Sequence, residues 1–243
     1  MSVSPNDFPT TRWSLVAKAS RISEDEQARA LATLCENYWQ PLYVFLRRTG
    51  HSPDSAMETL QGFFAAFLGR NYLADASAEK GRFRCYLLGS LRHFEANERE
   101  RERAIKRGGG RPCVSLDLDA QDGERRFLGE PHTDIDPEKL FHRRWAMSVV
   151  NGALMRLRER YEAMGEQRLY DYLVGFLVGT TAEESYAEAA TRLDMSASAV
   201  RMAVHRLRKR FRDTLHHQVA DTLLNAADVD DELRFLFAVL ADV

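Results

Sequence analysis

The sequence predicts an all-α protein in which an irregular linker joins two helical domains. Apolar residues recur every three or four positions along most of the 243-residue chain. This is the spacing of one buried helix face, and no convincing alternation of apolar and polar residues marks a strand. The periodicity stops between residues 107 and 139, where three consecutive glycines, prolines and mixed charges replace it. Such a composition is typical of a linker.

The helices are expected, in chain order, at residues 11–20, 24–48, 53–69, 79–106, 140–161, 165–178, 183–192, 197–217 and 230–241. Ser52, Pro53 and Asp54 give the third of them an N-cap, a proline at its first position and an early acid. Ser196 caps the helix at 197–217 in a similar way. Inside the linker, VSLDLD at 114–119 suits a short strand, an extended contact with a partner or, more simply, a surface loop.

The domain boundaries follow from these helices. We expect an N-terminal helical extension at 1–28, a first helical domain at 29–111, the linker at 112–139, a second helical domain at 140–217 and an acidic amphipathic extension at 218–243. In this last segment Leu233, Leu236, Phe237 and Leu240 share one helix face. That face packs on neighbouring parts of the chain or, alternatively, belongs to a regulatory tail whose acids compete with DNA for a basic helix.

The formal net charge of −2 conceals a segregation of charge along the chain. Residues 80–111 hold ten Lys or Arg and four Glu, a balance of +6, and residues 200–217 hold six basic residues and one Asp, a balance of +5. Residues 218–243 hold six acids and one Arg, a balance of −5. Two basic blocks and an acidic end favour a polyanionic partner, whereas the simpler interpretation is that these runs are solvated helix faces.

Several classes of protein are disfavoured by composition and motifs. No apolar run approaches the roughly 20 residues that span a bilayer, and the N-terminal residues do not form a signal peptide, so a cytoplasmic protein is expected. Cys35, Cys85 and Cys113 lie far apart without a CxxC pair, which disfavours a zinc site and disulfides.

An enzyme is also disfavoured. The sequence lacks GxxxxGK[ST], GxSxG and HExxH motifs. Asp117, Asp119 and Asp122 offer carboxylates to a metal ion, as in a nuclease, but the linker around them provides no rigid scaffold. We therefore expect no catalytic residues, no metal site and no cofactor.

The most specific pattern is a helix-turn-helix at residues 185–212, SYAEAATRLDMSASAVRMAVHRLRKRFR. Its second helix has an apolar stripe of Val200, Val204, Leu207 and Phe211, and its opposite side is basic over roughly 30 Å. Such a helix fits the DNA major groove, with its N-terminal half at base edges and its basic end at phosphates. The candidate DNA contacts are Ser196, Ser198, Arg201, His205, Arg208, Lys209 and Arg212. The alternative is a helical hairpin with a solvated basic face.

Residues 79–107 form a second candidate site for nucleic acid. Arginines interleave there with aromatic residues, a mixture that suits single-stranded or melted nucleic acid because bases stack on rings and arginines follow the backbone. Helical spacing assigns Phe83, Leu87 and Leu91 to the core and leaves the role of Tyr86 open between core and base stacking.

Two parts of the chain resemble bacterial RNA polymerase sigma factors of the extracytoplasmic-function (ECF) class of the sigma-70 family. YAEAATRLDMSASAVRMAVHRLRKRFR at 186–212 is similar to their C-terminal promoter-binding domain. ENYWQPLYVFLRRTGHSPDSAMETLQGFFAAFL at 36–68, followed by EKGRFRCYLLGSLRHFEANERERERAIKRGGG at 79–110, resembles their core domain in composition, order and spacing. FPTTRWSLV at 8–16 also looks like a subgroup of these factors.

The resemblance implies a function for each domain. Residues 29–111 would be sigma region 2, which docks on the polymerase and recognises and melts the minus-ten element, and residues 140–217 would be sigma region 4, whose helix-turn-helix reads the minus-thirty-five element. The linker would thread through the polymerase active-site cleft and RNA exit path. The implied minus-ten contacts are Arg82, Arg84, Tyr86, Arg92, His93, Asn97 and Arg99.

The partners expected from the resemblance are core RNA polymerase and promoter DNA, with a Ser/Thr protein kinase or an anti-sigma factor as a possible regulator and no membrane. The alternative function is a stand-alone helix-turn-helix transcriptional regulator that binds duplex DNA without polymerase.

The segment DSAMETLQGFF at 54–64 matches the part of the family that docks on a coiled coil of the largest polymerase subunit. The implied docking residues are Met57, Glu58, Thr59 and Gln61, but relatives carry two adjacent acids and an aliphatic residue at the first three positions. Loss of one carboxylate predicts docking weaker by about 1 to 3 kcal/mol. A phosphate on Thr59 would add about −1.5 to −2 charge. Thr59 is therefore a candidate phosphosite, and a neutral substitution is the simpler interpretation.

Overall fold

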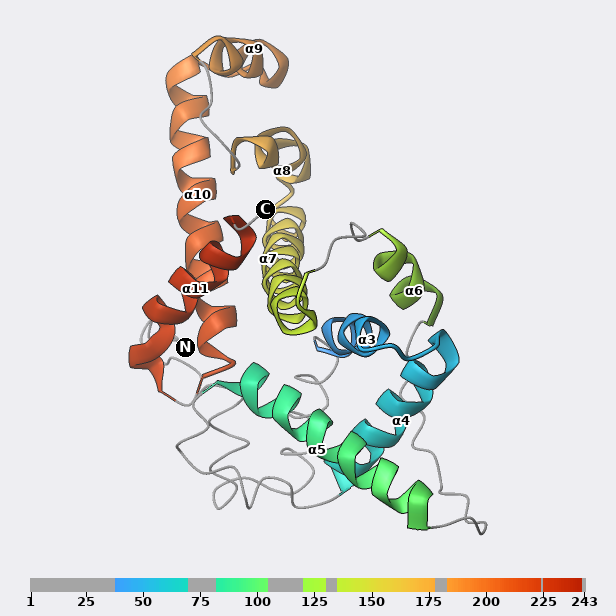
Figure 1. The fold of residues 1–243 in the computed structure, drawn as a ribbon. Helices are drawn as coiled ribbons and strands as arrows, with labels where there is room; N and C mark the ends of the chain where they lie inside the picture. Colours follow the sequence, from blue (N-terminus) through green and yellow to red (C-terminus); the bar gives the residue numbers. More distant parts are fainter. Residues whose placement is uncertain are drawn as a thin grey trace. The chain divides into compact units, whose positions relative to one another are not determined.

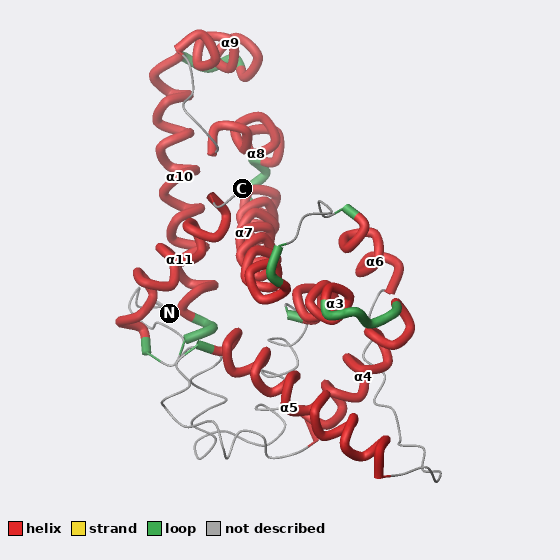
Figure 2. Tube along the Cα trace, in the orientation of Figure 1, coloured by secondary structure: helices red, strands yellow, loops and turns green. Residues whose placement is uncertain are grey.

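The computed structural model describes residues 38–69, 82–104, 120–129, 135–177, 183–223 and 225–241. The regular elements throughout those ranges are helices (Figures 1 and 2), and an isolated antiparallel bridge between Arg82 and Leu223 is the one strand-like pairing in them. The predicted all-α class is therefore confirmed for the described part of the chain.

The chain divides into two compact units, which we describe separately. Unit 1 consists of Met1–Met147 and Val219–Val243, and unit 2 consists of Ser148–Gln218. This grouping differs from the predicted domain boundaries at two places. Residues 140–147 belong to unit 1 rather than to the second unit, and the acidic C-terminal residues join unit 1.

The helices are distributed between the units as follows. Unit 1 contains α3 (Trp39–Arg48), α4 (Pro53–Gly69), α5 (Phe83–Ala104), α6 (Ala120–Leu128), the start of α7 (Pro137–Ala163), the 3-10 helix η4 (Ala226–Asp228) and α11 (Val229–Ala241). Unit 2 contains the rest of α7, α8 (Gln167–Leu173), the 3-10 helix η3 (Val174–Leu177), α9 (Glu183–Leu193) and most of α10 (Ala197–Ala220).

The predicted linker is wrong in one respect, because α6 lies inside it. Glu124 of α6 accepts a hydrogen bond from the Tyr43 hydroxyl at 2.7 Å and two from the Arg47 guanidinium at 2.9 Å, both on α3. Gly123 faces the Tyr43 ring so closely that a Cβ there would come within 3.2 Å of it. The predicted helix at 11–20 and the VSLDLD segment lie outside the described residues.

The core of unit 1 uses the apolar stripe of α4. Ala56, Leu60, Phe63, Phe64 and Phe67 are each at most 1% exposed, as the sequence predicts. The ring of Phe63 lies 5.8 Å from that of Phe94 on α5, and the ring of Phe67 lies 5.9 Å from that of Tyr86. The predicted cap of α4 is also present, since the Ser52 hydroxyl accepts the backbone N–H of Ser55 at 3.2 Å.

Three helices end in the same backbone motif. After α3, α7 and α9, a residue with positive φ (Gly50, Gly165 and Asp194) is followed by an N–H that bonds a carbonyl five residues back. This arrangement satisfies carbonyls that the last helical turn would otherwise leave unpaired. Asp194 is the unusual member, because a left-handed conformation is strained for a residue with a Cβ.

The core of unit 2 is built by α7, α8, η3, α9 and α10. Leu157 and Tyr161 of α7 pack in one cluster with Leu173, Ala189 and Val200 of the following helices. The Tyr170 hydroxyl donates to the Leu154 carbonyl at 3.0 Å, so α8 is fixed to α7 by a polar contact as well as by burial. This packing provides the rigid base on which α9 and α10 are held.

Candidate nucleic-acid interface

The turn between α9 and α10 is fixed by local hydrogen bonds. The Met195 N–H donates to the Ala190 carbonyl at 3.0 Å and ends α9. The Ser196 hydroxyl accepts the Ala199 N–H at 3.1 Å and lies 3.0 Å from the Ser198 hydroxyl. Ser196 is therefore the N-cap of α10, as predicted, and the short turn between the two helices has a defined geometry.

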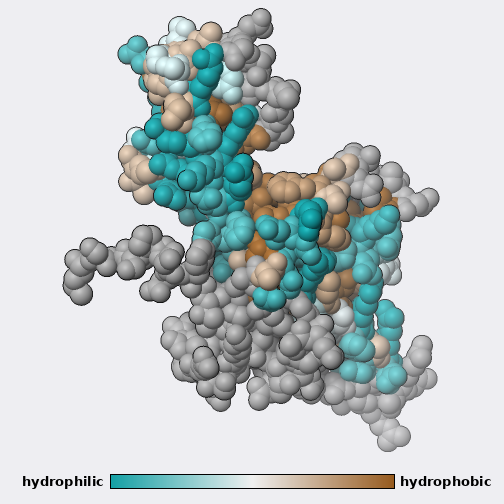
Figure 3. All heavy atoms as spheres, turned by 90° about the vertical axis from the view of Figure 1, so that its left-hand side faces the viewer, coloured by the Kyte–Doolittle hydropathy of each residue, from teal (hydrophilic) through white to brown (hydrophobic). Residues whose placement is uncertain are grey.

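The apolar side of α10 is buried as the sequence predicts. Val200, Val204 and Leu207 are at most 2% exposed, and Phe211 packs against the same cluster. Because these side chains fix the rotation of the helix, its opposite side faces outward. Figure 3 shows the surface over α10 as mainly hydrophilic, with small apolar patches.

Six of the seven predicted helix-turn-helix contacts lie on exposed positions. They are Ser196, Ser198, Arg201, His205, Lys209 and Arg212. The Arg201 guanidinium lies 5.7 Å from the centre of the Tyr186 ring of α9, a cation–π distance that orients this side chain. Between residues 195 and 212 the sequence has no acid, so the exposed face of this part of α10 attracts anions without internal competition.

Arg208 has a different environment from the other six. Its guanidinium donates to the Phe176 carbonyl at the end of η3, with distances of 3.2 Å from Nε and 2.9 Å from Nη2. The side chain is half-buried. Its prediction as a DNA contact is not supported by this geometry, because the planar donor group is used to satisfy a carbonyl within unit 2.

The second predicted surface, on α5, is divided by burial. Arg92, His93, Asn97 and Arg99 are exposed. Arg92 forms a 2.8 Å ion pair with Glu138, in which both side chains are nearly half exposed. Arg99 pairs with Glu95 at 3.1 Å. The exposed Arg92–Glu138 pair contributes about 0 to 1 kcal/mol, so a phosphate can replace the Glu138 carboxylate at little cost, whereas the Glu95 partner of Arg99 is only 9% exposed.

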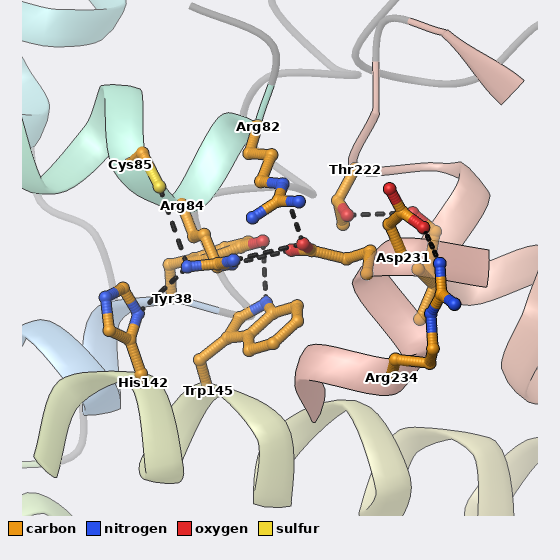
Figure 4. A network of polar contacts seen from close by, with 11 residues as sticks. Tyr38, Arg82, Arg84, Cys85, His142, Trp145, Thr222, Asp231 and Arg234 are labelled. Atoms are coloured by element: carbon orange, nitrogen blue, oxygen red, sulfur yellow. Dashed lines mark hydrogen bonds and ion pairs between the residues drawn. The ribbon is translucent and has the colours of Figure 1, made fainter. Parts of the chain in front are cut away.

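Arg84, which was predicted to contact DNA, is instead 2% exposed. Its Nε and Nη2 bond both carboxylate oxygens of Glu232 on α11, at 2.6 and 3.0 Å. The guanidinium carbon lies 4.9 Å from the centre of the Trp145 ring and 4.1 Å from that of the Phe235 ring, within cation–π distance of both. Figure 4 shows Arg84 among Trp145, His142 and Tyr38. The bidentate pair neutralises a charge that would be costly to bury alone.

His142 completes the surroundings of Arg84. Arg84 Nη1 lies 3.1 Å from His142 Nδ1 and, since a guanidinium has only donors, this imidazole nitrogen accepts. Burial, and then the charge of Arg84, lowers the pKa of His142 to about 4. The imidazole is thus neutral at physiological pH, and Arg84 has the charge in this contact.

Arg82 and Tyr86 also depart from the predicted surface. Arg82 reaches the same Glu232 carboxylate at 3.0 Å, while its side chain is 37% exposed, so it lies at the edge of the buried cluster. Tyr86 is 7% exposed and packs on Phe67, which answers the open question about this ring in favour of the core. Of the predicted minus-ten contacts, Arg92, His93, Asn97 and Arg99 are therefore exposed, with Arg82 at the margin of the buried cluster.

The predicted docking edge lies on the outer side of α4. Glu58 is exposed opposite the buried stripe, and Met57, Thr59 and Gln61 are half-buried beside it. The single carboxylate of this edge therefore lies at its centre, with Met57 and Thr59 on the two flanks.

Glu232 is the residue that the sequence reasoning missed. It appeared only as one acid in a run of acids, and its partner Arg84 lies 148 positions away. The available signal was helical spacing, because Glu232 is one turn from the buried residues Val229 and Leu236. A charged residue at such a position requires a buried partner.

The described ranges contain neither a candidate metal site nor a helix that could span a membrane. Within them, no three His, Cys, Asp or Glu side chains are grouped so that they could hold a metal ion. Asp117 and Asp119 lie outside the described residues. None of the described helices combines the length and apolar character needed to cross a membrane.

The described fold is that of an all-helical protein with a helix-turn-helix whose second helix has an exposed basic face. Comparison with models of known protein families, with curated proteins and with solved structures finds no significant match to this chain. The interpretation of the site therefore depends on the residues themselves and on the motif resemblance described above.

Proposed function

We propose that this protein is an ECF-type sigma factor, which binds core RNA polymerase in the cytoplasm and directs promoter recognition and transcription initiation. The observation that carries the proposal is the α9–α10 arrangement. A capped turn and a buried Val200–Val204–Leu207 stripe hold six polar or basic residues outward on a helix of major-groove size.

The proposal gives each surface a task. The exposed face of α10 reads the minus-thirty-five element, with Ser198, Arg201 and His205 near base edges and Lys209 and Arg212 at phosphates. Arg92, His93, Asn97 and Arg99 on α5 contact the melted minus-ten element. The outer edge of α4 docks on the polymerase. In this proposal the domain that contains α5 and the domain that contains α10 each read one promoter element within the same initiation complex.

Thr59 is proposed as the regulatory position of the docking edge. It flanks the exposed Glu58. The sigma factors that this segment resembles carry a second acid at the position of Met57 and an aliphatic residue at that of Thr59. Phosphorylation by a Ser/Thr kinase would add the negative charge that Met57 does not supply, and would strengthen docking on a basic partner. Core affinity of the wild type, Thr59→Glu and Thr59→Ala tests this directly. Equal affinities of the three proteins would leave no switch to explain.

The function is tested by mixing the full chain with purified core RNA polymerase. We expect co-elution in gel filtration, and promoter-sized duplexes bound tightly by the complex but weakly by either component. A stand-alone regulator would give the opposite result, namely specific duplex binding by the chain alone and no complex with polymerase. The phosphomimetic Thr59→Glu protein is included, so that a requirement for phosphate is not mistaken for absence of binding.

A further inference from the structure

Met202 is a large apolar side chain on the outward face of α10. It is 57% exposed, whereas Val200, Val204 and Leu207 on the opposite side are at most 2% exposed. Helical spacing places it on one stripe with Ser198, one turn before it, and with His205 and Lys209 after it. Met202 therefore lies in the N-terminal half of the helix, at the centre of the surface proposed to enter DNA.

The surroundings of Met202 indicate what it contacts. A single exposed apolar residue is common and has no meaning by itself. Here, however, the neighbouring positions are Arg201 and Arg206, and no acid occurs between residues 195 and 212. An anionic partner that also offers an apolar group at the position of Met202 would match both features of this surface.

Duplex DNA offers one apolar group in the major groove, the C5-methyl group of thymine. The N-terminal half of a recognition helix is the part that contacts base edges. We propose that Met202 reads a thymine by contact with this methyl group, and so sets base preference at one position of the bound site. The inference rests on the proposed DNA-binding function of α10 and names a specificity residue within it.

The contact distinguishes DNA from other polyanions. Uracil lacks the methyl group, so RNA of the same sequence offers Met202 no apolar partner. An acidic protein would satisfy the arginines, but it has no thymine to recognise and would show no dependence on this methyl group. Replacement of thymine by deoxyuridine therefore isolates the proposed contact, because it removes one methyl group and leaves base pairing unchanged.

The experiment uses the full chain with core RNA polymerase. Bound duplexes are selected from a library with a randomised central segment, and each thymine of the selected site is then replaced singly by deoxyuridine. At one position we expect about a four-fold loss of affinity, the effect of one buried methyl group. Met202→Gln should abolish the loss at that position only, and Met202→Leu should retain it. Met155→Gln, which changes a methionine of α7 that is 63% exposed, is the matched control.

The possible results separate the two proposals. A selected site without thymine, or an unchanged deoxyuridine effect in Met202→Gln, overturns the role of Met202 while DNA binding stands. Absence of any selected duplex, with normal folding by circular dichroism, overturns the proposed function and this inference together. A loss of duplex binding in Met202→Gln that is equal at all positions also contradicts a thymine contact.

Discussion

At the scale of single residues, Arg84 shows how one buried contact changes the interpretation of a basic sequence. Its position among arginines and aromatic rings favours contact with nucleic acid. In the structure its charge is matched by Glu232, and its guanidinium lies against the rings of Trp145 and Phe235. Arginines and aromatic residues therefore occur both in the core and on the surface of this segment, and only their burial distinguishes the two roles.

Removal of the Glu232 charge is expected to destabilise unit 1. Glu232→Gln leaves two guanidiniums, those of Arg82 and Arg84, without their carboxylate, which costs about 3 to 5 kcal/mol for a buried pair. Urea unfolding followed by tryptophan fluorescence measures this, because the described tryptophans Trp39 and Trp145 lie in unit 1. Asp231→Asn, at a side chain that is 58% exposed, is the control and should change stability by less than about 0.5 kcal/mol. Equal effects of the two substitutions would contradict the assigned role of Glu232.

His142 is expected to make unit 1 sensitive to acid. Its pKa is lowered to about 4 by burial and by Arg84, with Glu138, Glu232 and Arg92 also acting on it. An unfolded histidine takes up its proton near pH 6.5, so the folded state loses stability as pH falls from about 6.5 to about 4, by up to about 3 kcal/mol. Unfolding measured across this range should show a flatter profile in His142→Gln. A profile identical to that of the wild type would exclude His142 as the cause.

Asp194 is expected to limit the stability of the helix-turn-helix. Its φ of 53° is strained for a side chain with a Cβ. Asp194→Gly should therefore stabilise unit 2 by about 0.5 to 1 kcal/mol, while Asp194→Val should destabilise it by about 1 to 2 kcal/mol. Hydrogen exchange of the α10 amides measures both changes. The same sign for both variants would show that the turn does not hold this conformation.

At the scale of elements, α10 has a buried side, an exposed side and a border between them. One side packs in unit 2, the opposite side is exposed and basic, and Arg208 lies at the border between them, bonded to η3. The charge of a residue in this helix therefore does not by itself indicate a DNA contact. Burial and hydrogen bonding separate Arg208 from its neighbour Lys209.

This border gives a paired prediction. Lys209→Ala should weaken duplex binding for all sequences and reduce the slope of log Kd against log salt concentration by about 1, because one phosphate contact is lost. Arg208→Ala should leave the slope unchanged and destabilise unit 2 by about 1 to 3 kcal/mol, because the Phe176 carbonyl loses its donor. If both variants change the slope equally, Arg208 is a phosphate contact despite its hydrogen bonds.

Local patterns predicted most of the helices but not every partner. Residue spacing predicts the bounds of α4 and the buried side of α10, and capping chemistry predicts the roles of Ser52 and Ser196. Both signals come from residues that are neighbours in the sequence. Helix α6 was missed because its sequence, AQDGERRFL, has a glycine and few apolar residues. It is held by Tyr43 and Arg47 of α3, and such distant contacts leave no periodic signal in the sequence.

At the scale of the whole molecule, the acidic end of the chain contributes an acid to the core of unit 1. Val229, Glu232 and Leu236 of α11 are buried in unit 1, which confirms packing on neighbouring parts of the chain for this segment. Phe237, predicted on the same apolar face, is instead 53% exposed. The segregation of charge along the sequence therefore has two structural counterparts. Arg84 of the first basic block and Glu232 of the acidic end form a buried ion pair in unit 1, and most of the basic residues of α10 lie on an exposed helix face.

The central claim is that this chain gives core RNA polymerase promoter specificity. Run-off transcription of genomic fragments by the cognate core enzyme, with and without the chain, followed by sequencing of transcript 5′ ends, tests it most directly. We predict that the chain creates new start sites at a fixed distance from a shared pair of upstream elements, and that Arg201→Ala with Lys209→Ala removes them. Start sites that are the same with and without the chain, including its Thr59→Glu variant, would contradict the claim.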